Sequence, residues 1–550
     1  MATTVVEGQE RLVEVPAGVS GERAAERAPV GEEKTFRPYD PDQVLLMAPV
    51  LSEWLPEGDL AHFVSDLVES GALDLSAVYA SYEEERGFPP YDPRLMVKLL
   101  VYGYANGVMS SRKLEAATYR DVAVRMLCAD QHPDYRSIAR FRARHLGALA
   151  GLFVQALRLC RQARLVGLGA LALDGTKLRA NASRHKAMSY ERMVKKEAQL
   201  EAEIAALRKN VEELLEAAER VDAAEDERFG PDRRGDELPQ ELQRREQRLA
   251  VIREAKQALE AEAFARETAR HAELEAQGKK PRPPREGRDP FKPKPTAQRN
   301  FTDPESKIMK TSDGAYHQCF NGQAIVDSKT QVIVVAELSD QAPDAEQLAP
   351  ALDQLDENLD AIGVELPEGA VLTADGGYFS ADNVMTTVVH GLDPFIATGR
   401  FKHSEPQPPA SRGPIPKDAT PKQQMARKVR SKKGRAVYAR RKAIVEPVFG
   451  QMDTVQDARR LLLRGKQAAR DQWRFHCAVH NLLKLHRAGG LPLIGPQPGA
   501  DGTPPSRNGP RAAPLSALRD RARAFRCWFA SKWRVCAAIS GPALVTDPRS

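Results

Sequence analysis

Apolar residues recur at helical spacing through the first third of the chain. Three short runs begin at Pro93, Ser111 and Ser137, and turn residues separate them. A serine hydroxyl can accept from the free amides of a first helical turn, which favours helix starts at Ser110 or Ser111 and at Ser137. The pattern predicts a small helical domain over residues 36–165.

The helix expected after Ser137 carries Arg140, Arg142 and Arg144 close together near its surface. A helix that docks on DNA presents such side chains to the nucleic acid. A solvated basic face has the same composition. The sequence leaves both interpretations open.

A heptad pattern fills residues 190–275. Apolar residues follow alternating steps of four and three in two runs, and Arg245 and Lys256 interrupt the second run. The segment between the runs, Phe229 to Asp236, has the composition of a turn. This predicts an antiparallel helical hairpin, a coiled-coil insertion. The predicted seam consists of Leu200, Ile204, Leu207, Val211, Leu214, Ala218 and Val221, then Leu238, Leu242, Leu249, Ile252, Leu259 and Ala263.

Strand-like segments lie on both sides of this insertion. They are residues 166–173 before it and 318–326, 331–338, 370–374 and 394–398 after it. Helical patterns separate the later ones, at 344–358 and 380–390, and a last helical run begins near Arg440. The order predicts an α/β fold whose mixed sheet begins as an antiparallel meander and continues with parallel strands.

The two ends of the chain have other compositions. Residues 1–35 lack periodicity and predict a flexible leader. Residues 489–550 are rich in Pro, Gly and Arg and predict a tail, whose basic and aromatic stretch at 515–535 is either an amphipathic helix on DNA or an extension without a partner. Residues 166–488 then form the main domain.

Composition narrows the class of protein. The chain is 42% hydrophobic, enough for at least one large core, and its net charge of +6 is too small to imply nucleic acid binding without local clusters. Its six cysteines show no CxxC spacing, and no apolar stretch is long enough for a membrane helix or a signal peptide. We expect a cytoplasmic protein.

Two acids follow predicted strands directly. Asp174 ends the apolar strand in Leu-Ala-Leu-Asp-Gly, and Asp375 ends the one in Leu-Thr-Ala-Asp-Gly-Gly. A single Asp-Gly after a strand usually marks a turn. Two of them at strand ends of one sheet predict a site, and Ser380 is placed to cap the next helix.

Glu446 is the third candidate acid. It stands among apolar residues at helical spacing, before a proline that suits only a first turn or a kink. We expect it on the inner side of its helix, where a carboxylate needs a partner. Either a cation shared with Asp174 and Asp375 or an ion pair with Arg440 or Arg441 supplies one.

Oxygen ligands without His or Cys favour Mg²⁺ or Mn²⁺. Two such ions about 4 Å apart would activate water and stabilise the leaving oxygen of a phosphodiester. His476 and His480 are spaced to share a zinc ion, but their helix is otherwise core-like. Between Lys422 and Lys442 the chain has ten Lys or Arg and no acid, which indicates a phosphate-binding strip beside the acids or a solvated charge run.

Several blocks together resemble the DDE transposases of bacterial insertion sequences, in particular the group called eleven eighty-two. They span about Phe36 to Arg487. The blocks are LALDGTKLRANAS (171–183), DPESKIMK (303–310), YHQCFNGQAIVD (316–327), LTADGGYFS (372–380), RRKAIVEPVFGQ (440–451), and the later LLLRGK and HNLLKLHR.

The resemblance implies a ribonuclease-H-like core, metal-dependent cleavage and strand transfer of double-stranded DNA at transposon ends and target, and a homodimer on DNA at the nucleoid. It makes Asp174, Asp375 and Glu446 the catalytic, metal-binding acids, with two ions of Mg or Mn. Together with the basic clusters it gives the DNA-binding residues as Tyr438, Arg441, Lys442, Lys432, Lys433, Arg435, Arg140 and Arg144.

One position departs from the family. Related proteins have a basic residue where this chain has Asp453, seven residues and so two helical turns after Glu446. An acid there would repel DNA. The alternative function is a transposase-derived DNA-binding or regulatory protein that no longer catalyses, and the presence of all three acids favours the enzyme.

Overall fold

The computed structural model describes residues 50–490, except 83–89, 184–185, 207–208, 210–239, 277, 279, 281–288, 312, 400–412, 414–415 and 417. The predicted leader (1–35) and all but the first two residues of the predicted tail (489–550) lie outside the described residues. None of the described helices is both long and apolar enough to cross a membrane.

The N-terminal part is helical, as predicted. The longest helices, α3 and α7, are amphipathic and bury most of their apolar residues in the main core. The elements are η1 (Leu51–Trp54), α1 (Leu60–Glu69), α2 (Ser76–Tyr79), α3 (Pro93–Ala105), α4 (Ser111–Arg120), α5 (Val122–Leu127), α6 (Tyr135–Arg144) and α7 (Leu146–Gln162).

Helix α6 begins earlier than the sequence predicts. Asp134 is its N-cap, and Oδ1 of Asp134 accepts from the amides of Arg136 and Ser137 at 2.8 and 3.1 Å. The prediction of Ser137 as the cap is therefore wrong. A carboxylate that accepts from two amides and carries the favoured charge caps better than a hydroxyl one turn later.

Arg142 does not lie on the surface. Its guanidinium is buried and donates to the Met109 carbonyl and to Oγ of Ser111, both at 2.6 Å, so it joins α6 to the start of α4. Arg140 and Arg144 are exposed as expected, and the Arg144 guanidinium lies 5.1 Å from the centre of the Tyr82 ring.

The central sheet has the predicted topology. Strand β5 pairs antiparallel with β1 and β6, and β1 pairs parallel with β7, which pairs parallel with β8. The sequence missed β4, which pairs with the start of β5. The strands are β1 (Ala170–Arg179), β4 (Lys307–Lys310), β5 (Tyr316–Asp327), β6 (Ile333–Ser339), β7 (Val371–Ala374) and β8 (Asp393–Ile396).

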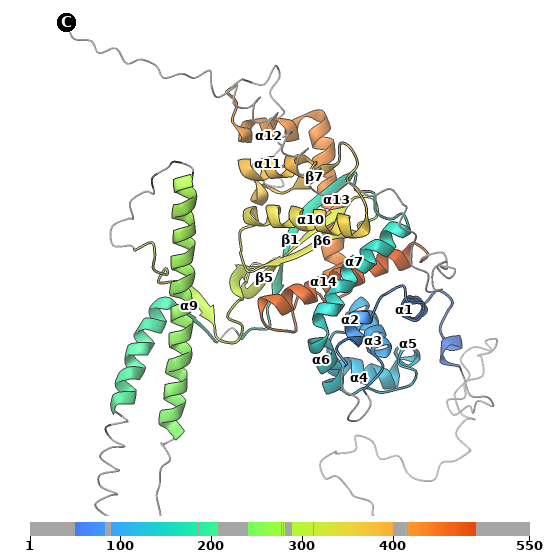
Figure 1. Ribbon diagram of the computed structural model, residues 1–550, viewed down its shortest axis with the longest axis horizontal. Coiled ribbons are helices and arrows are strands. Elements are labelled where there is room, and N and C mark those ends of the chain that lie inside the picture. The colour runs from blue at the N-terminus through green and yellow to red at the C-terminus, as the bar shows by residue number, and fades with distance from the viewer. Residues whose placement is uncertain are drawn as a thin grey trace, which may run out of the picture. The chain divides into compact units, whose positions relative to one another are not determined.

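Helices cover both faces of this sheet. Figure 1 shows α10 (Leu348–Ile362) and α11 (Ala381–Val389) in front of the sheet and α13 (Lys432–Thr454) behind it. On the α13 face, Trp473 of α14 (Lys466–Arg487) lies against β5 at Gly322, where an added Cβ would come within 3.2 Å of its ring. The order of strands and their coverage by helices agree with a ribonuclease-H-like core.

Two long helical segments pack against each other beside the sheet. Residues 190–206 and α9 (Gln240–Ala276) run antiparallel, because Glu197 pairs with Lys256 at 2.8 Å and Glu203 pairs with Arg245 at 3.1 Å. The two cations that interrupt the heptads thus have partners within the chain. The buried seam consists of Leu200, Ile204, Leu249, Ile252, Leu259 and Ala263.

The link that would close the predicted hairpin is mostly outside the described residues, so the hairpin as a whole stays a prediction. A small two-stranded sheet, β2 (Ala187–Ser189) with β3 (Gln298–Asn300), joins the bases of the two helical segments to the main body.

Candidate active site

Asp174 and Asp375 lie side by side. The parallel register of β1 and β7 sets Leu173 opposite Ala374, so the next residue of each chain segment is an acid. Asp174 lies within β1, which continues past the point where β7 ends, and Asp375 is the first residue beyond β7. The sheet itself therefore fixes the spacing of these two carboxylates.

The glycines after the two acids make room for polar side chains. Asp375 caps the short helix η4 (Gly376–Tyr378), and its Oδ1 accepts from the amide of Gly377 at 2.8 Å. A Cβ on Gly377 would lie 3.0 Å from that oxygen, and a Cβ on Gly175 would lie 2.6 Å from Nε2 of Gln323. Any larger residue at either position would displace the groups around the acids.

Arg441 of α13 is the direct partner of Asp174. Its Nη1 lies 2.7 Å from Oδ2 of Asp174, and the two side chains are 10% and 23% exposed. Burial raises the pKa of Asp174 above its ordinary value, against the opposing attraction of Arg441. Burial also disfavours the charged guanidinium, but Asp174, Tyr438 and Asp375 together outweigh burial and raise the pKa of Arg441. The ionised form of Asp174 is therefore stabilised by the positive charge of Arg441.

Tyr438 lies one turn before Arg441 and belongs to the same site. It is partly buried, and burial raises the pKa of its phenol, with the charges of Asp375 and Asp174 acting in the same direction and Arg441 against them. Tyr438, Arg441 and the two aspartates therefore form one electrostatic group.

Glu446 does not join this group. Its side chain is 63% exposed, and its Oε1 lies 4.0 Å from Nζ of Lys442. The expectation that Glu446 faces inward is wrong for this structure, because Ile444, Val445 and Val448 occupy the buried face of α13. Five residues separate Glu446 from Arg441, a rotation of about 140° around the helix axis.

The ion-pair alternative for Glu446 is met by Lys442, at long range, and not by Arg440 or Arg441. Within the described parts of the chain, no group of three or more acidic, His or Cys side chains is arranged to hold a metal ion.

Pro447 lies inside α13, neither in its first turn nor at its end. A proline has no amide to donate to the carbonyl four residues earlier, which is that of Ala443. Nε2 of Gln331, in the turn between β5 and β6, donates to this carbonyl at 3.0 Å. The same Gln331 accepts from Lys484 of α14 through Oε1 at 2.8 Å. One side chain thus connects the interrupted turn of α13 to α14.

The predicted basic strip lies at the start of α13. Lys432, Lys433 and Arg435 are exposed there. Gly434 between them is buried where α12 (Pro421–Arg430) meets α13. A Cβ at this position would collide with the backbone of Lys428, so only glycine fits there. This close contact holds the strip one to three turns before Tyr438 and Arg441.

Asp453 is paired within the chain. Its Oδ2 lies 3.2 Å from Nε of Arg459, and burial raises its pKa above the ordinary value. The negative charge that departs from the family pattern is therefore largely offset by a neighbouring cation.

His476 and His480 are core residues. Both are buried, and burial lowers the pKa of each to about 3, so both rings are neutral. His480 bonds to the Gln331 carbonyl at 3.0 Å, and the His476 ring lies 4.7 Å from that of Tyr104. They supply no metal site.

Two features of the site were not predicted from the sequence. Asp344, in the loop after β6, accepts from Lys177 at 3.2 Å on the other face of β1. Lys177 belongs to the first-acid block, so its position could have been suspected, whereas Asp344 begins the segment predicted to be helical (344–358) and belongs to no motif. The block at 303–310 also has a structural explanation, because Asp303 and Glu305 accept from the first amides of α14, at Gly465 and Lys466.

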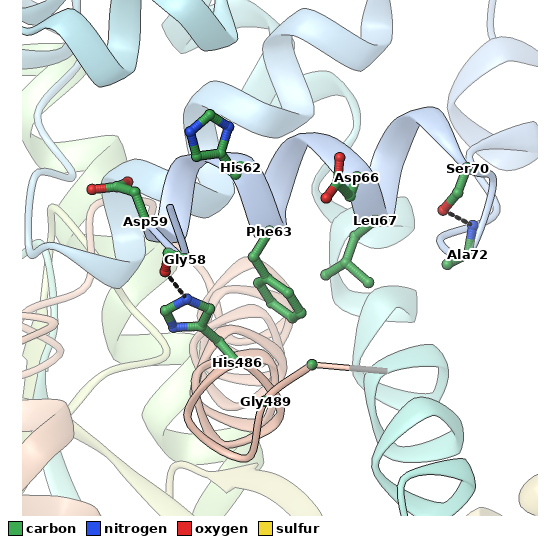
Figure 2. Close-up of a pocket in the computed structure, with 11 residues that line it drawn as sticks. Gly58, Asp59, His62, Phe63, Asp66, Leu67, Ser70, Ala72, His486 and Gly489 are labelled. Carbon is green, nitrogen blue, oxygen red and sulfur yellow. Dashed lines mark hydrogen bonds between the residues drawn. The ribbon is translucent and has the colours of Figure 1, made fainter. Parts of the chain in front are cut away.

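An open hollow of about 410 Å³ lies elsewhere, between α1 and the end of α14 (Figure 2). The ring of Phe63 stacks at a tilt on His486, with 5.1 Å between ring centres, and Nε2 of His486 lies 2.9 Å from the Gly58 carbonyl. The hollow shares no residue with the acid site, so we assign it to the packing of α1 on α14.

Comparison with known families agrees with the motifs. Residues 49–144 match the model of a transposase domain (DUF772), and residues 288–482 match the model of the transposase DDE domain. No curated protein and no solved structure matches the chain. The second match covers Asp375 and Glu446 but begins after Asp174, so the position of Asp174 rests on the sheet geometry described above.

Proposed function

We propose that this chain, which is a DDE transposase of the insertion-sequence kind and acts on DNA, uses Asp174, Asp375 and Glu446 as its catalytic carboxylates. The observation that carries the proposal is the pair of aspartates that directly follow the last parallel pair of β1 and β7, with a cationic side chain of α13 on Asp174. The order of its sequence blocks supports placing the chain in the group called eleven eighty-two. We also propose that it acts at the nucleoid.

The donor set fits Mg²⁺ or Mn²⁺. Both aspartates offer hard oxygen ligands, Asp174 already depends on a positive charge, and no His or Cys of the described residues joins them in a metal-binding group. When bound, two such ions would activate water and stabilise the leaving oxygen of the phosphodiester. Asp174 and Asp375 would hold them from the sheet and Glu446 from α13.

Arg441 connects cation binding to DNA binding in this proposal. While no other cation is near, its guanidinium neutralises Asp174. A DNA phosphate beside Tyr438 and Lys442 offers Arg441 another anion. When the Arg441 guanidinium moves to that phosphate, Oδ2 of Asp174 is free to bind a metal ion. For Glu446 to reach the pair, α13 must rotate by part of a turn, which the break in its hydrogen bonding at Pro447 facilitates.

DNA is held by exposed cations on two parts of the chain. Lys432, Lys433 and Arg435 lead along α13 to the acids and suit the phosphate backbone. Arg140 and Arg144 on α6 are the second contact. We propose a homodimer on DNA, since a transposon has two ends and each needs its own set of acids.

The test is Mg²⁺-dependent cleavage of transposon-end DNA by the full chain. Asp174→Asn, Asp375→Asn and Glu446→Gln should each lower the cleavage rate at least about 10³-fold, close to 4 kcal/mol of activation free energy, with end binding little changed. Asp382→Asn, an exposed acid at the start of α11, is the matched control and should cleave normally. Two near-normal variants of the three would refute the assignment, and a wild-type chain that binds ends but never cleaves them would support the regulatory alternative.

A further inference from the structure

We infer that Asp344 is a positioning residue for Asp375 and acts from the opposite face of the sheet through Gln323 and Tyr378. The inference rests on the proposed role of Asp375 as a metal ligand. It assigns a function to the loop between β6 and α10, which the family motifs leave without one.

Asp344 is held by three donors on one oxygen. Its Oδ1 accepts from Nδ2 of Asn321 at 2.9 Å, from Nζ of Lys177 at 3.2 Å and from Nε2 of Gln323 at 3.3 Å. Lys177 and Gly175 alternate with Asp174 along β1, so this cluster lies on the face away from Arg441. Hydrogen bonds to an ionised acceptor are short-ranged and directional, and three of them fix the carboxylate.

The connection continues from Gln323 to the turn that bears Asp375. Oε1 of Gln323 accepts from the hydroxyl of Tyr378, the last residue of η4, and that ring is fully buried. Asp344 also packs directly on Gly377, because a Cβ there would lie 3.4 Å from its Oδ2. The amide of Gly377 is the donor to Oδ1 of Asp375. Asp344 therefore supports the turn through its last residue and through the residue that orients the acid.

A second connection ties the same two segments together. Nδ2 of Asn383 in α11 donates to the carbonyls of Ala345 and Tyr378, both at 2.7 Å. The loop after β6 and the turn after β7 are thus joined on both sides of Asp344. They behave as one support for Asp375, separate from the sheet register that sets Asp174.

Loss of this support should weaken metal binding more than DNA binding. A divalent ion needs its carboxylate oxygens at fixed positions, and removing a group that orients a ligand typically costs about 10- to 100-fold in metal affinity. The side-chain partners of Asp344 are Lys177, Asn321 and Gln323, none of which belongs to the basic strip or to α6, so end binding without metal should not change.

The experiment measures Mn²⁺ binding to the full chain by electron paramagnetic resonance, together with the Mg²⁺ concentration for half-maximal cleavage. Asp344→Ala and Tyr378→Phe should each lower Mn²⁺ affinity about tenfold and raise the Mg²⁺ requirement to match. The double variant should lose no more than Asp344→Ala alone, because Tyr378→Phe breaks a connection that already depends on Asp344. Asp344→Asn, which keeps an acceptor oxygen, should recover part of the affinity and serves if the alanine variant does not fold.

Asp340→Asn is the matched control. This acid lies in the same loop and pairs with Lys466 at 2.6 Å, and among the described residues it has no hydrogen bond or ion pair with η4. Wild-type Mn²⁺ affinity in Asp344→Ala, additive losses in the double variant, or an equal loss in Asp340→Asn would overturn the inference. If Asp375→Asn itself left Mn²⁺ affinity intact, the proposed metal ligand would be wrong, which is a separate outcome.

Discussion

The two strand-borne acids and the helix-borne acid differ in what holds them. Asp174 and Asp375 are set by backbone pairing between β1 and β7, and their surroundings are buried and polar. Glu446 projects from α13 into solvent, with only a distant lysine beside it. A sheet fixes position through register, whereas a helix leaves the direction of a side chain to the rotation of the whole element. Of the three acids in the assignment proposed above, two therefore lie next to each other in this structure.

The same contrast appears in the two ion pairs on α13. Arg441 with Asp174 is short and mostly buried, while Lys442 with Glu446 is long and exposed. Adjacent residues of one helix thus make the strongest and the weakest contact with the candidate acids. Breaking each ion pair in turn measures how much the two pairs differ in their contribution to the free energy of unfolding.

The largest expected effect on stability is that of Arg441→Ala. This variant leaves the carboxylate of Asp174 without its cation in a buried place, which should lower the free energy of unfolding by about 3 kcal/mol. Lys442→Ala, the matched control one residue away, should change it by less than about 0.5 kcal/mol. Chemical denaturation of the two variants gives both numbers.

The expected loss has a further check. Mg²⁺ at millimolar concentration should restore part of the stability of Arg441→Ala and none in the double variant with Asp174→Asn, because the ion replaces the missing positive charge. Equal losses in Arg441→Ala and Lys442→Ala would show that the two pairs do not differ, and the comparison would fail.

Much of the sheet could be predicted because its signals are local. Apolar strands separated by helical patterns gave the correct order of pairing. Asp375 follows its strand as predicted, whereas the prediction that Asp174 ends a strand is wrong, because β1 continues to Arg179 along its antiparallel partner β5. Strand β4 was missed because Lys307 to Lys310 has only two apolar residues, and its partner strand supplies the pattern that it lacks. The limits of α6 were missed because a better cap stood one turn earlier.

The direction of Glu446 could not be predicted from spacing alone. Apolar residues flank it on both sides, and only the packing of Val445 and Val448 decides which face of α13 is buried. Asp344 gave no signal for a related reason. Its role depends on residues far away in the chain that the sheet brings together, and as the first residue of a predicted helix it belonged to no motif that marks a site.

Gln331→Met tests whether α13, which bears Glu446, is held less firmly than the strand β1, which bears Asp174. The variant removes both the donor to the Ala443 carbonyl beside Pro447 and the acceptor of Lys484 while it keeps side-chain volume, so it should cost at least about 1 kcal/mol of unfolding free energy. Hydrogen exchange should become faster in residues 443–450 of α13 and stay unchanged in β1. The backbone of residue 331 has φ of 63°, which Met and Gln tolerate equally poorly, so the substitution adds no difference in strain.

Thr330→Val is the control for Gln331→Met. It lies in the same turn and loses a hydrogen bond to the Leu165 carbonyl, not to α13. Faster exchange in 443–450 for both variants would trace the effect to the turn as a whole and remove the special role of Gln331.

The smallest expected effect concerns Asp453, at the far end of the helix that bears Glu446. Asp453→Asn removes the partner of Arg459, whose side chain is 62% exposed and is then available to a DNA phosphate. We expect a two- to threefold gain in affinity for transposon-end DNA, roughly 0.5 kcal/mol, and a slope of log affinity against log salt that steepens by about 0.9.

Asp457→Asn makes the same change in charge four residues later and has no ion pair to release among the described residues, so it separates the two possible causes. If the gain comes from freeing Arg459, Asp453→Asn should exceed Asp457→Asn in both affinity and slope. Equal changes would mean that only the total charge near the end of α13 matters. In that case Arg459 does not contact DNA, and the basic side chain that the family carries at position 453 has no substitute in this chain.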